Sequence, residues 1–393
     1  MSDRVAAGAT YRSALDGAFR RLESQPETSD YARLCGSALR AAGDDAGKLG
    51  RQAMRRLSPS GTRVQRAAAT LIATANEGMG WPNFRSASLA MFRELEQLPG
   101  APQDERDLAT VARTCLEACK AGEDGGKVAW SFLEELGSGK VDPGARRLAR
   151  ILLAASDRGM SWDNYAAAIG AGLNVLEADG PEAVLLEAGR RSVAACSDAT
   201  DRGKVGRALM HQLKEPLTES PEGAVSRLAL AASSEGITWK GFASVSRCVL
   251  ESVEQSPYVE LALAAQSAAR SDEERGKLGR GFLRELAGQD GTGNSAARAY
   301  RHAAEDGLSW AGYEASLEAG LRKLSEGGAQ FGPVARGDAR ARCPALLAAV
   351  EGVERLSGVR AEVQKLVSNP SSAGIEADES KVLVGGVRLK VRR

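Results

Sequence analysis

The sequence is poor in aromatic residues and in histidine. Aromatic residues make up 5% of the 393 residues, and the two histidines are His211 and His302. Because general acid–base and triad chemistry relies heavily on histidine, these counts leave little material for a hydrolase site or a zinc-protease motif. We therefore expect a protein that is not an enzyme, with no catalytic residue, no cofactor and no small-molecule substrate.

The sequence also lacks long apolar runs and a strong net charge. No apolar run approaches the about 20 residues that a membrane-spanning helix needs. Residues 1–10 lack the charged-then-apolar build of a signal peptide. The net charge of +1 gives no overall attraction to nucleic acid or to anionic membranes, although a local basic patch stays open. We expect a cytoplasmic protein that does not bind membranes.

The six cysteines are spread over predicted helices rather than gathered in loops. A secreted disulfide framework is denser and richer in loops, so we expect these thiols to be reduced. Cys115 and Cys119 lie four residues apart on one helix face, where two thiolates could share a zinc ion. No other cysteine or histidine lies nearby in the sequence. We therefore expect small buried side chains and no metal site.

What the chain does contain is a motif of glycine, two residues, tryptophan, two residues and an aromatic residue. It occurs four times, with the tryptophans separated by 81, 77 and 71 residues. The copies are Gly78…Trp81…Phe84, Gly159…Trp162…Tyr165, Gly236…Trp239…Phe242 and Gly307…Trp310…Tyr313. Such regular self-similarity is typical of a repeat protein, in which each unit buries its apolar face against the next.

A second motif repeats in step with the first: an acidic residue, any residue, Gly-Lys and an aliphatic residue. Its acid and lysine are Asp45 and Lys48, Asp124 and Lys127, Asp201 and Lys204, and Glu274 and Lys277. Helix N-termini with lysine can bind phosphate, but the further glycine and the Ser/Thr of a P-loop are missing. We interpret the motif as a repeated helix start, with the acid placed favourably at the positive end of the helix dipole. A row of lysines that binds a polyanion is the alternative.

The residues around each tryptophan predict a helix–turn–helix corner. Apolar residues recur three, eleven and fourteen positions after the tryptophan, which places them on one face of a helix. The preceding residue is a serine or threonine in three copies and suits an N-cap. The glycine three positions before the tryptophan suits the left-handed end of the previous helix. We expect the tryptophan to wedge into this corner.

These landmarks predict about four helices in each repeat of roughly 75 residues, or two hairpins of about 38. The pattern resembles HEAT- and armadillo-like repeats in hairpin length, without their consensus motifs. The fold class that we predict is all-α: an α-solenoid of four repeats over residues 1–367, with divergent caps at both ends. Residues 11–23 match residues 313–325 and form a degenerate first helix, and residues 333–367 form the final cap.

The C-terminal segment, residues 368–393, departs from the repeat pattern. A linker rich in serine, proline and glycine is followed by two short β-prone runs around Gly385-Gly386, which predicts a basic β-hairpin. An isolated hairpin is marginal in water, so we expect it to pack on helices or to join a partner. The predicted partner-binding residues are Lys381, Val382, Val384, Val387, Arg388, Lys390, Arg392 and Arg393.

Two functions remain open from the sequence. The first is a scaffold or adaptor that binds protein through an extended helical surface or through the hairpin, or a structural component of a larger assembly. The alternative is nucleic-acid binding along a ridge of lysines and arginines, since Arg51, Arg207 and Arg280 each follow a landmark lysine by three residues. In the second repeat Trp130 takes that position and interrupts the ridge.

Overall fold

A computed structural model describes most of the chain. The described residues are 2–57, 61–139, 144–176, 180–218, 220–288, 295–326, 344, 346–352, 382–384 and 387–389. They divide into two compact units, Met1–Cys248 and Val249–Arg393, with the boundary inside one helix, Trp239–Ser252. Each unit is described by itself.

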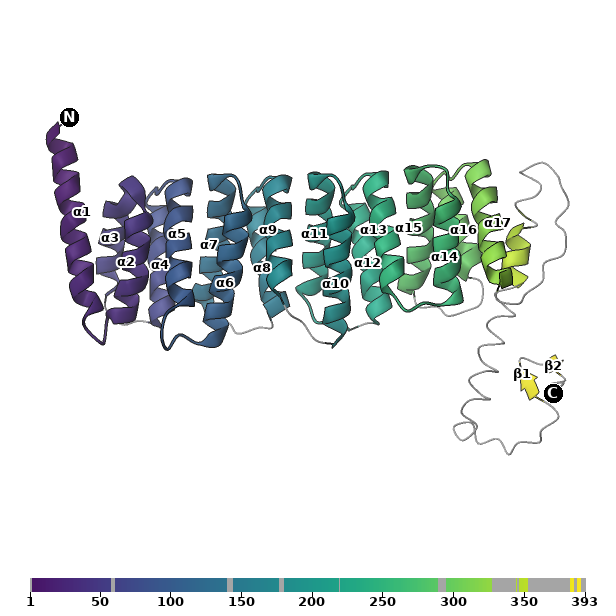
Figure 1. Ribbon diagram of the computed structural model, residues 1–393, viewed down its shortest axis with the longest axis horizontal. Coiled ribbons are helices and arrows are strands. Elements are labelled where there is room, and N and C mark those ends of the chain that lie inside the picture. Colours follow the sequence, from purple (N-terminus) through teal and green to yellow (C-terminus); the bar gives the residue numbers. More distant parts are fainter. Residues whose placement is uncertain are drawn as a thin grey trace. The chain divides into compact units, whose positions relative to one another are not determined.

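The first unit is helical throughout its described residues (Figure 1). It begins with α1 (Ser2–Glu23), α2 (Ser29–Ala41), the 3-10 turn η1 (Gly43–Asp45), α3 (Ala46–Arg55), α4 (Arg63–Asn76), α5 (Trp81–Glu96) and α6 (Gln103–Ala118). It continues with α7 (Gly122–Ser138), α8 (Gly144–Asp157), α9 (Trp162–Val175), α10 (Gly180–Ala195), α11 (Ala199–Leu213), α12 (Pro221–Ser234) and α13 (Trp239–Ser252). The predicted order of four helices in each repeat is confirmed.

The second unit continues the same order of elements. Its helices are α14 (Pro257–Ala268), α15 (Asp272–Gly288), α16 (Ser295–Glu305) and α17 (Trp310–Glu326). Two short strands follow, β1 (Val382–Val384) and β2 (Val387–Leu389), which pair antiparallel with Val384 opposite Val387. The turn between these strands lies outside the described residues. The prediction of an all-α repeat fold is confirmed for the described residues between 2 and 326.

Within the first unit the helices form two rows. One row places α2, α5, α6, α9 and α10 side by side, and the other places α3, α4, α7, α8, α11 and α12 side by side. Contacts of α5 with α7 and of α9 with α11 join the rows. The core between them is built from the apolar faces that the sequence pattern indicates, with Phe84, Phe92 and Tyr165 almost completely buried.

The predicted helix ends are confirmed at the corners. Gly78, Gly159, Gly236 and Gly307 all have positive φ, between 76° and 83°, which glycine adopts without steric cost. The Ser161 hydroxyl accepts a hydrogen bond from the Asn164 N–H and caps α9. Within the described ranges, every helix is too short or too polar to span a lipid bilayer.

Candidate interaction groove

The two sequence motifs meet in space through what we call the acid–lysine pair. In the second repeat, Asp124 on α7 accepts hydrogen bonds from the Ser161 N–H at 3.2 Å and the Ser161 hydroxyl at 2.7 Å. Lys127, one turn further along α7, donates to the Gly159 carbonyl at 2.8 Å. The carboxylate thus satisfies the start of α9 while the lysine satisfies the end of α8. One helix therefore fixes both ends of its neighbouring corner.

The same arrangement recurs in every repeat. The lysine-to-glycine-carbonyl distances are 2.8 Å for Lys48, 2.7 Å for Lys204 and 2.9 Å for Lys277. Asp45 accepts from the Gly80 N–H, Asp201 from the Thr238 N–H, and Glu274 from the Ser309 hydroxyl. The prediction that the acid serves its own helix dipole is incomplete, because its side chain turns to the first turn of a helix more than 30 residues away. The lysines are structural donors.

Hydrogen bonding shifts the pKa of the groups in the second pair. Burial alone would raise the pKa of the Asp124 carboxyl, but hydrogen bonds from Ser161 and Asn164 and the charge of Lys127 outweigh it and hold this pKa below its usual range. Burial likewise acts to lower the pKa of Lys127, and its bonds with Glu123 and Asp124 outweigh that effect and raise it. Both groups are therefore charged at neutral pH.

The residue two positions after each tryptophan lies beside the acid of the acid–lysine pair, and it is either an asparagine or a glycine. In the first two repeats it is an asparagine, and Asn83 and Asn164 donate to Asp45 at 2.9 Å and to Asp124 at 2.8 Å. In the last two it is a glycine, and a Cβ at Gly241 would overlap the Asp201 carboxylate. The carboxylate occupies the space that the asparagine side chain takes elsewhere.

Trp81 and Trp162 do not wedge into their own corners, which corrects the prediction for these two copies. Each stands at the first position of its helix and is only partly buried. A Cβ at Gly126 would lie 2.5 Å from Cε3 of Trp81, and one at Gly203 would lie 2.7 Å from Cε3 of Trp162. In these two copies the ring therefore packs on the Gly-Lys glycine of the following repeat, which explains why Gly126 and Gly203 are glycines.

The arginines of the predicted ridge are engaged in ion pairs. Arg51 pairs with Glu77, Arg207 with Glu235 and Arg280 with Asp306, in each case with the residue just before the corner glycine. In the second repeat both residues of this pair differ, because Trp130 takes the place of the arginine and Arg158 takes the place of the acid. The Arg158 guanidinium lies 5.4 Å from the ring centroid of Trp130. A cation–π contact thus replaces the ion pair.

The first unit contains two equivalent junctions, each formed by three neighbouring helices. They differ in the side chains that lie between these helices. At the first junction (α5, α6 and α7), the Arg85 guanidinium donates to the carbonyls of Leu116 at 2.8 Å and Cys119 at 2.9 Å. Arg93 on α5 bridges to Glu117 on α6 at 2.8 Å. Long side chains therefore tie α5 to α6.

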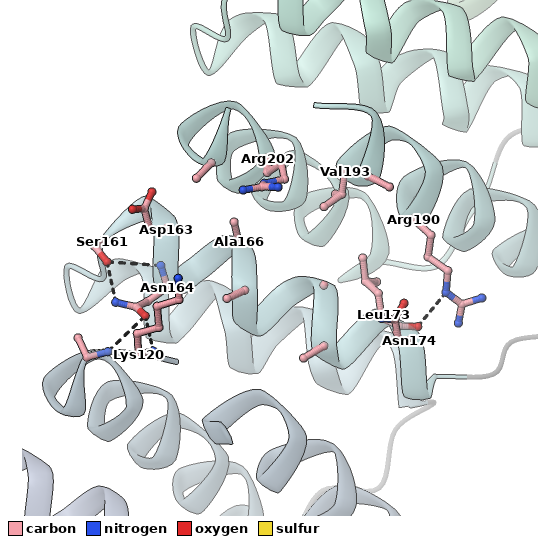
Figure 2. Close-up of a pocket in the computed structure, with 16 residues that line it drawn as sticks. Lys120, Ser161, Asp163, Asn164, Ala166, Leu173, Asn174, Arg190, Val193 and Arg202 are labelled. Atoms are coloured by element: carbon pink, nitrogen blue, oxygen red, sulfur yellow. Dashed lines mark hydrogen bonds between the residues drawn. The ribbon is translucent and has the colours of Figure 1, made fainter. Parts of the chain in front are cut away.

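At the second junction (α9, α10 and α11) the structure contains a groove of about 1010 Å³ (Figure 2). We call it the α9–α10 groove. It is lined by Lys120, Ala121, Ser161, Asp163, Asn164, Ala166, Ala167, Gly170, Ala171, Leu173, Asn174, Arg190, Val193, Ala194, Ala199 and Arg202. Its floor is one face of α9, from Asp163 to Asn174.

The groove exists because smaller residues replace the bridging ones. Counting from the landmarks, Ala166 stands where the first junction has Arg85, Gly170 where it has Leu89, and Asn174 where it has Arg93. Ala194 on α10 stands where α6 has Glu117. The change at Arg202 on α11 goes the other way: this arginine takes the place of Gly125, where a Cβ would overlap the Arg85 side chain.

The groove carries more positive than negative charge. Figure 2 shows Lys120 and Arg190 near opposite ends and Arg202 between them, across from Ala166. Arg190 is engaged, because its Nε donates to the Leu173 carbonyl at 2.8 Å. Among the described residues, the side chains of Lys120 and Arg202 have no hydrogen-bond or ion-pair partner. Asp163 is the one acidic lining residue.

The acid–lysine pair also holds the groove in place. Asn164, fixed by Asp124, accepts a hydrogen bond at its Oδ1 from the Lys120 N–H at 2.7 Å. The start of α11 is fixed by Asp198, which accepts from the N–H groups of Thr200 and Asp201. Both cations without partners therefore project from rigid backbone.

The cysteine prediction concerns the closely spaced pair Cys115 and Cys119. Cys115 and Cys119 are buried free thiols whose Sγ atoms lie near carbonyl oxygens, and burial raises the pKa of Cys119 to about 12. Among the residues described, no group of three or more His, Cys, Asp or Glu side chains is placed to hold a metal ion.

Of the predicted tail site, Val382, Val384, Val387 and Arg388 lie in the strands, whereas Lys381, Lys390, Arg392 and Arg393 lie outside the described residues.

Comparisons of the chain with protein-family models, with curated proteins and with solved structures found no match. The sequence reasoning missed the α9–α10 groove. The signal that could have found it is the loss of every large side chain at matched positions of one repeat, Ala166, Gly170 and Asn174, while the landmarks around them are kept.

Proposed function

We propose that this chain is a non-enzymatic scaffold or adaptor of the cytoplasm, built as an α-solenoid, that binds a protein partner. A structural component of a larger assembly belongs to the same class. The observation that carries the proposal is the α9–α10 groove, a concavity that holds two cations without hydrogen-bond or ion-pair partners among the described residues, at a junction whose counterpart is bridged by Arg85. Solenoids use such extended surfaces for recognition.

The second contact that we propose is the C-terminal hairpin. Its strands are three residues long, so the pair offers backbone hydrogen bonds at both edges to a partner's sheet. The basic residues Lys381, Arg388, Lys390, Arg392 and Arg393 would favour an acidic partner.

Nucleic-acid binding along the predicted ridge stays the alternative. The landmark lysines donate to glycine carbonyls, and the ridge arginines pair with acids, so these cations already have partners. Binding to a phosphate backbone would require breaking those bonds or using other cations.

A pull-down from host lysate, with and without nuclease, tests the proposal. Three baits are compared: the full chain, a chain ending at Val367, and the full chain carrying Asn174→Arg and Ala194→Glu. We expect a discrete protein partner that survives nuclease and moderate salt and that is lost from at least one of the two altered baits. Recovery of material only without nuclease would reject the scaffold in favour of nucleic-acid binding.

A further inference from the structure

We propose that the α9–α10 groove binds an acidic α-helical segment of a partner protein. The inference rests on the proposed scaffold function and goes beyond it by naming the site and the chemistry of the partner. The groove has three properties that select this occupant: its length along α9, its small-residue floor and its charge.

The length of the groove fits a short helix. Six of its lining residues on α9 follow helical spacing along one face: Asp163, Ala166, Ala167, Gly170, Ala171 and Asn174. From the first to the last, that face runs for about 16 Å at 1.5 Å per residue. An antiparallel or parallel helix of about three turns would cover it.

The floor lets a helix approach closely. Ala166, Ala167, Gly170 and Ala171 present nothing larger than a methyl group, and Val193 and Ala194 of α10 form an apolar side wall. Small side chains at a helix–helix contact let the two backbones come near each other and gain dispersion contacts along their length. A partner helix would therefore place small apolar residues against α9.

The positive charges of the groove require acidic residues along the margins of the partner helix. Lys120 and Arg202 lack hydrogen-bond and ion-pair partners among the described residues, and Arg202 is half-buried. A half-buried guanidinium gains from a carboxylate, which it can bind with two parallel hydrogen bonds. Ala199 and Arg202 also stand in the first turns of α11, where the helix dipole favours negative charge.

The same features disfavour a nucleic-acid strand. Phosphate-backbone binding uses rows of cations, and single-stranded bases stack on exposed aromatic rings. The groove offers two partnerless cations, one carboxylate and no aromatic side chain in its lining. An acidic amphipathic helix uses both the charges and the apolar floor.

The first junction provides a control inside the same chain. Its charges are matched, because Arg93 pairs with Glu117 and Arg113 pairs with Glu96. Introducing the pair Asn174→Arg and Ala194→Glu copies that bridge onto exposed positions of the second junction and closes the groove. Because both positions are exposed, the variant should fold as the original chain does.

The test is a selection of displayed random peptides of about 16 residues on the full chain, at about 0.15 M salt. Enriched peptides are synthesised, and their affinities are measured by fluorescence anisotropy. We expect helix-forming sequences with Asp or Glu flanking alanine-like residues. Their affinity should fall about tenfold or more in the Asn174→Arg, Ala194→Glu chain and in Arg202→Glu.

Arg21→Glu is the matched control, because Arg21 is an exposed arginine on α1 and its reversal changes the net charge equally. We expect its affinity to stay within about twofold. No enrichment, enriched peptides without acidic residues, or equal affinity for the closed groove would overturn the inference. So would binding of an RNA of about 20 nucleotides that is lost in Arg202→Glu while no peptide binds. If the closed-groove bait still captures its partner from lysate, the scaffold function stands and this site alone is rejected.

Discussion

The first and second junctions of the first unit share one backbone arrangement and differ in what fills it. In both, a carboxylate and the lysine three residues after it fix a corner, and a tryptophan packs on a glycine of the next repeat. Arg85 and the Arg93–Glu117 bridge tie α5 to α6, whereas Ala166, Asn174 and Ala194 leave a groove along α9 and α10. The repeated residues therefore build the frame, and the residues between them decide which surface it offers.

The largest expected effect tests whether the frame is the same at both junctions. Replacing Asp124 by alanine leaves the Ser161 N–H without its acceptor and removes one partner each from the Asn164 amide and the Lys127 ammonium. We expect a loss of about 3 kcal/mol in the free energy of unfolding. Asp45→Ala, which removes the matching hydrogen bonds from Gly80 and Asn83 at the first junction, should cost a similar amount, as measured by urea unfolding followed by circular dichroism. A loss below about 1 kcal/mol at either site would contradict a common frame.

The next effect concerns the contact between tryptophan and glycine. A methyl group at Gly126 would overlap the Trp81 ring, and one at Gly203 would overlap the Trp162 ring. Gly126→Ala and Gly203→Ala should each destabilise the chain by about 1–3 kcal/mol. Gly137→Ala, in the same helix as Gly126 but with nothing within 4 Å, should stabilise it by up to about 1 kcal/mol. Equal melting temperatures for the three variants would show that the glycines do not serve this packing.

A smaller effect separates the two junctions. Arg85→Ala removes the hydrogen bonds of the guanidinium to the carbonyls of Leu116 and Cys119 and should cost about 1–2 kcal/mol in the free energy of unfolding. Arg202→Gln, which breaks no hydrogen bond or ion pair among the described residues, should change it by less than about 0.5 kcal/mol. Equal costs in chemical denaturation would remove the distinction between a bridged and an open junction.

The smallest effect is on pH dependence. The pKa of Asp124 is below its usual range in the folded chain, so the unfolded chain binds its proton first as the pH falls. The stabilisation by Asp124 is therefore complete above the ordinary carboxyl pKa of about 3.9 and is lost as the pH falls through the lower, folded value. Urea unfolding from about pH 6 to pH 3 should show a shallower decline for Asp124→Asn than for the original chain. Identical slopes would exclude this group as a source of acid sensitivity.

Local sequence signals predicted the frame well. Glycine followed by a serine or threonine cap indicates where one helix ends and the next begins, as at Gly159 and Ser161. Helical spacing placed Phe84 and Phe92 in the core correctly. These features depend on a few neighbouring residues and on their backbone preferences, so they can be predicted from the sequence alone.

The contacts between distant segments could not be predicted in the same way. Asp124 was assigned to its own helix because the dipole argument is local, whereas its hydrogen bonds reach Ser161. The partner of Trp81 is a glycine of the next repeat, which offers no side chain to suggest a contact. The α9–α10 groove results from missing side chains, and a run of alanines in a helix predicts only a good helix.

The most direct test of the central claim is a double-mutant cycle at the second junction. Ala166→Arg restores the bridging arginine of the first junction, and Arg202→Gly restores the glycine that makes room for it. The free energy of unfolding is measured for the original chain, both single variants and the double variant. The account predicts that the double variant is more stable than the sum of the two changes by about 1 kcal/mol or more. Additivity within about 0.5 kcal/mol would contradict the claim that this exchange decides whether the junction is closed or open.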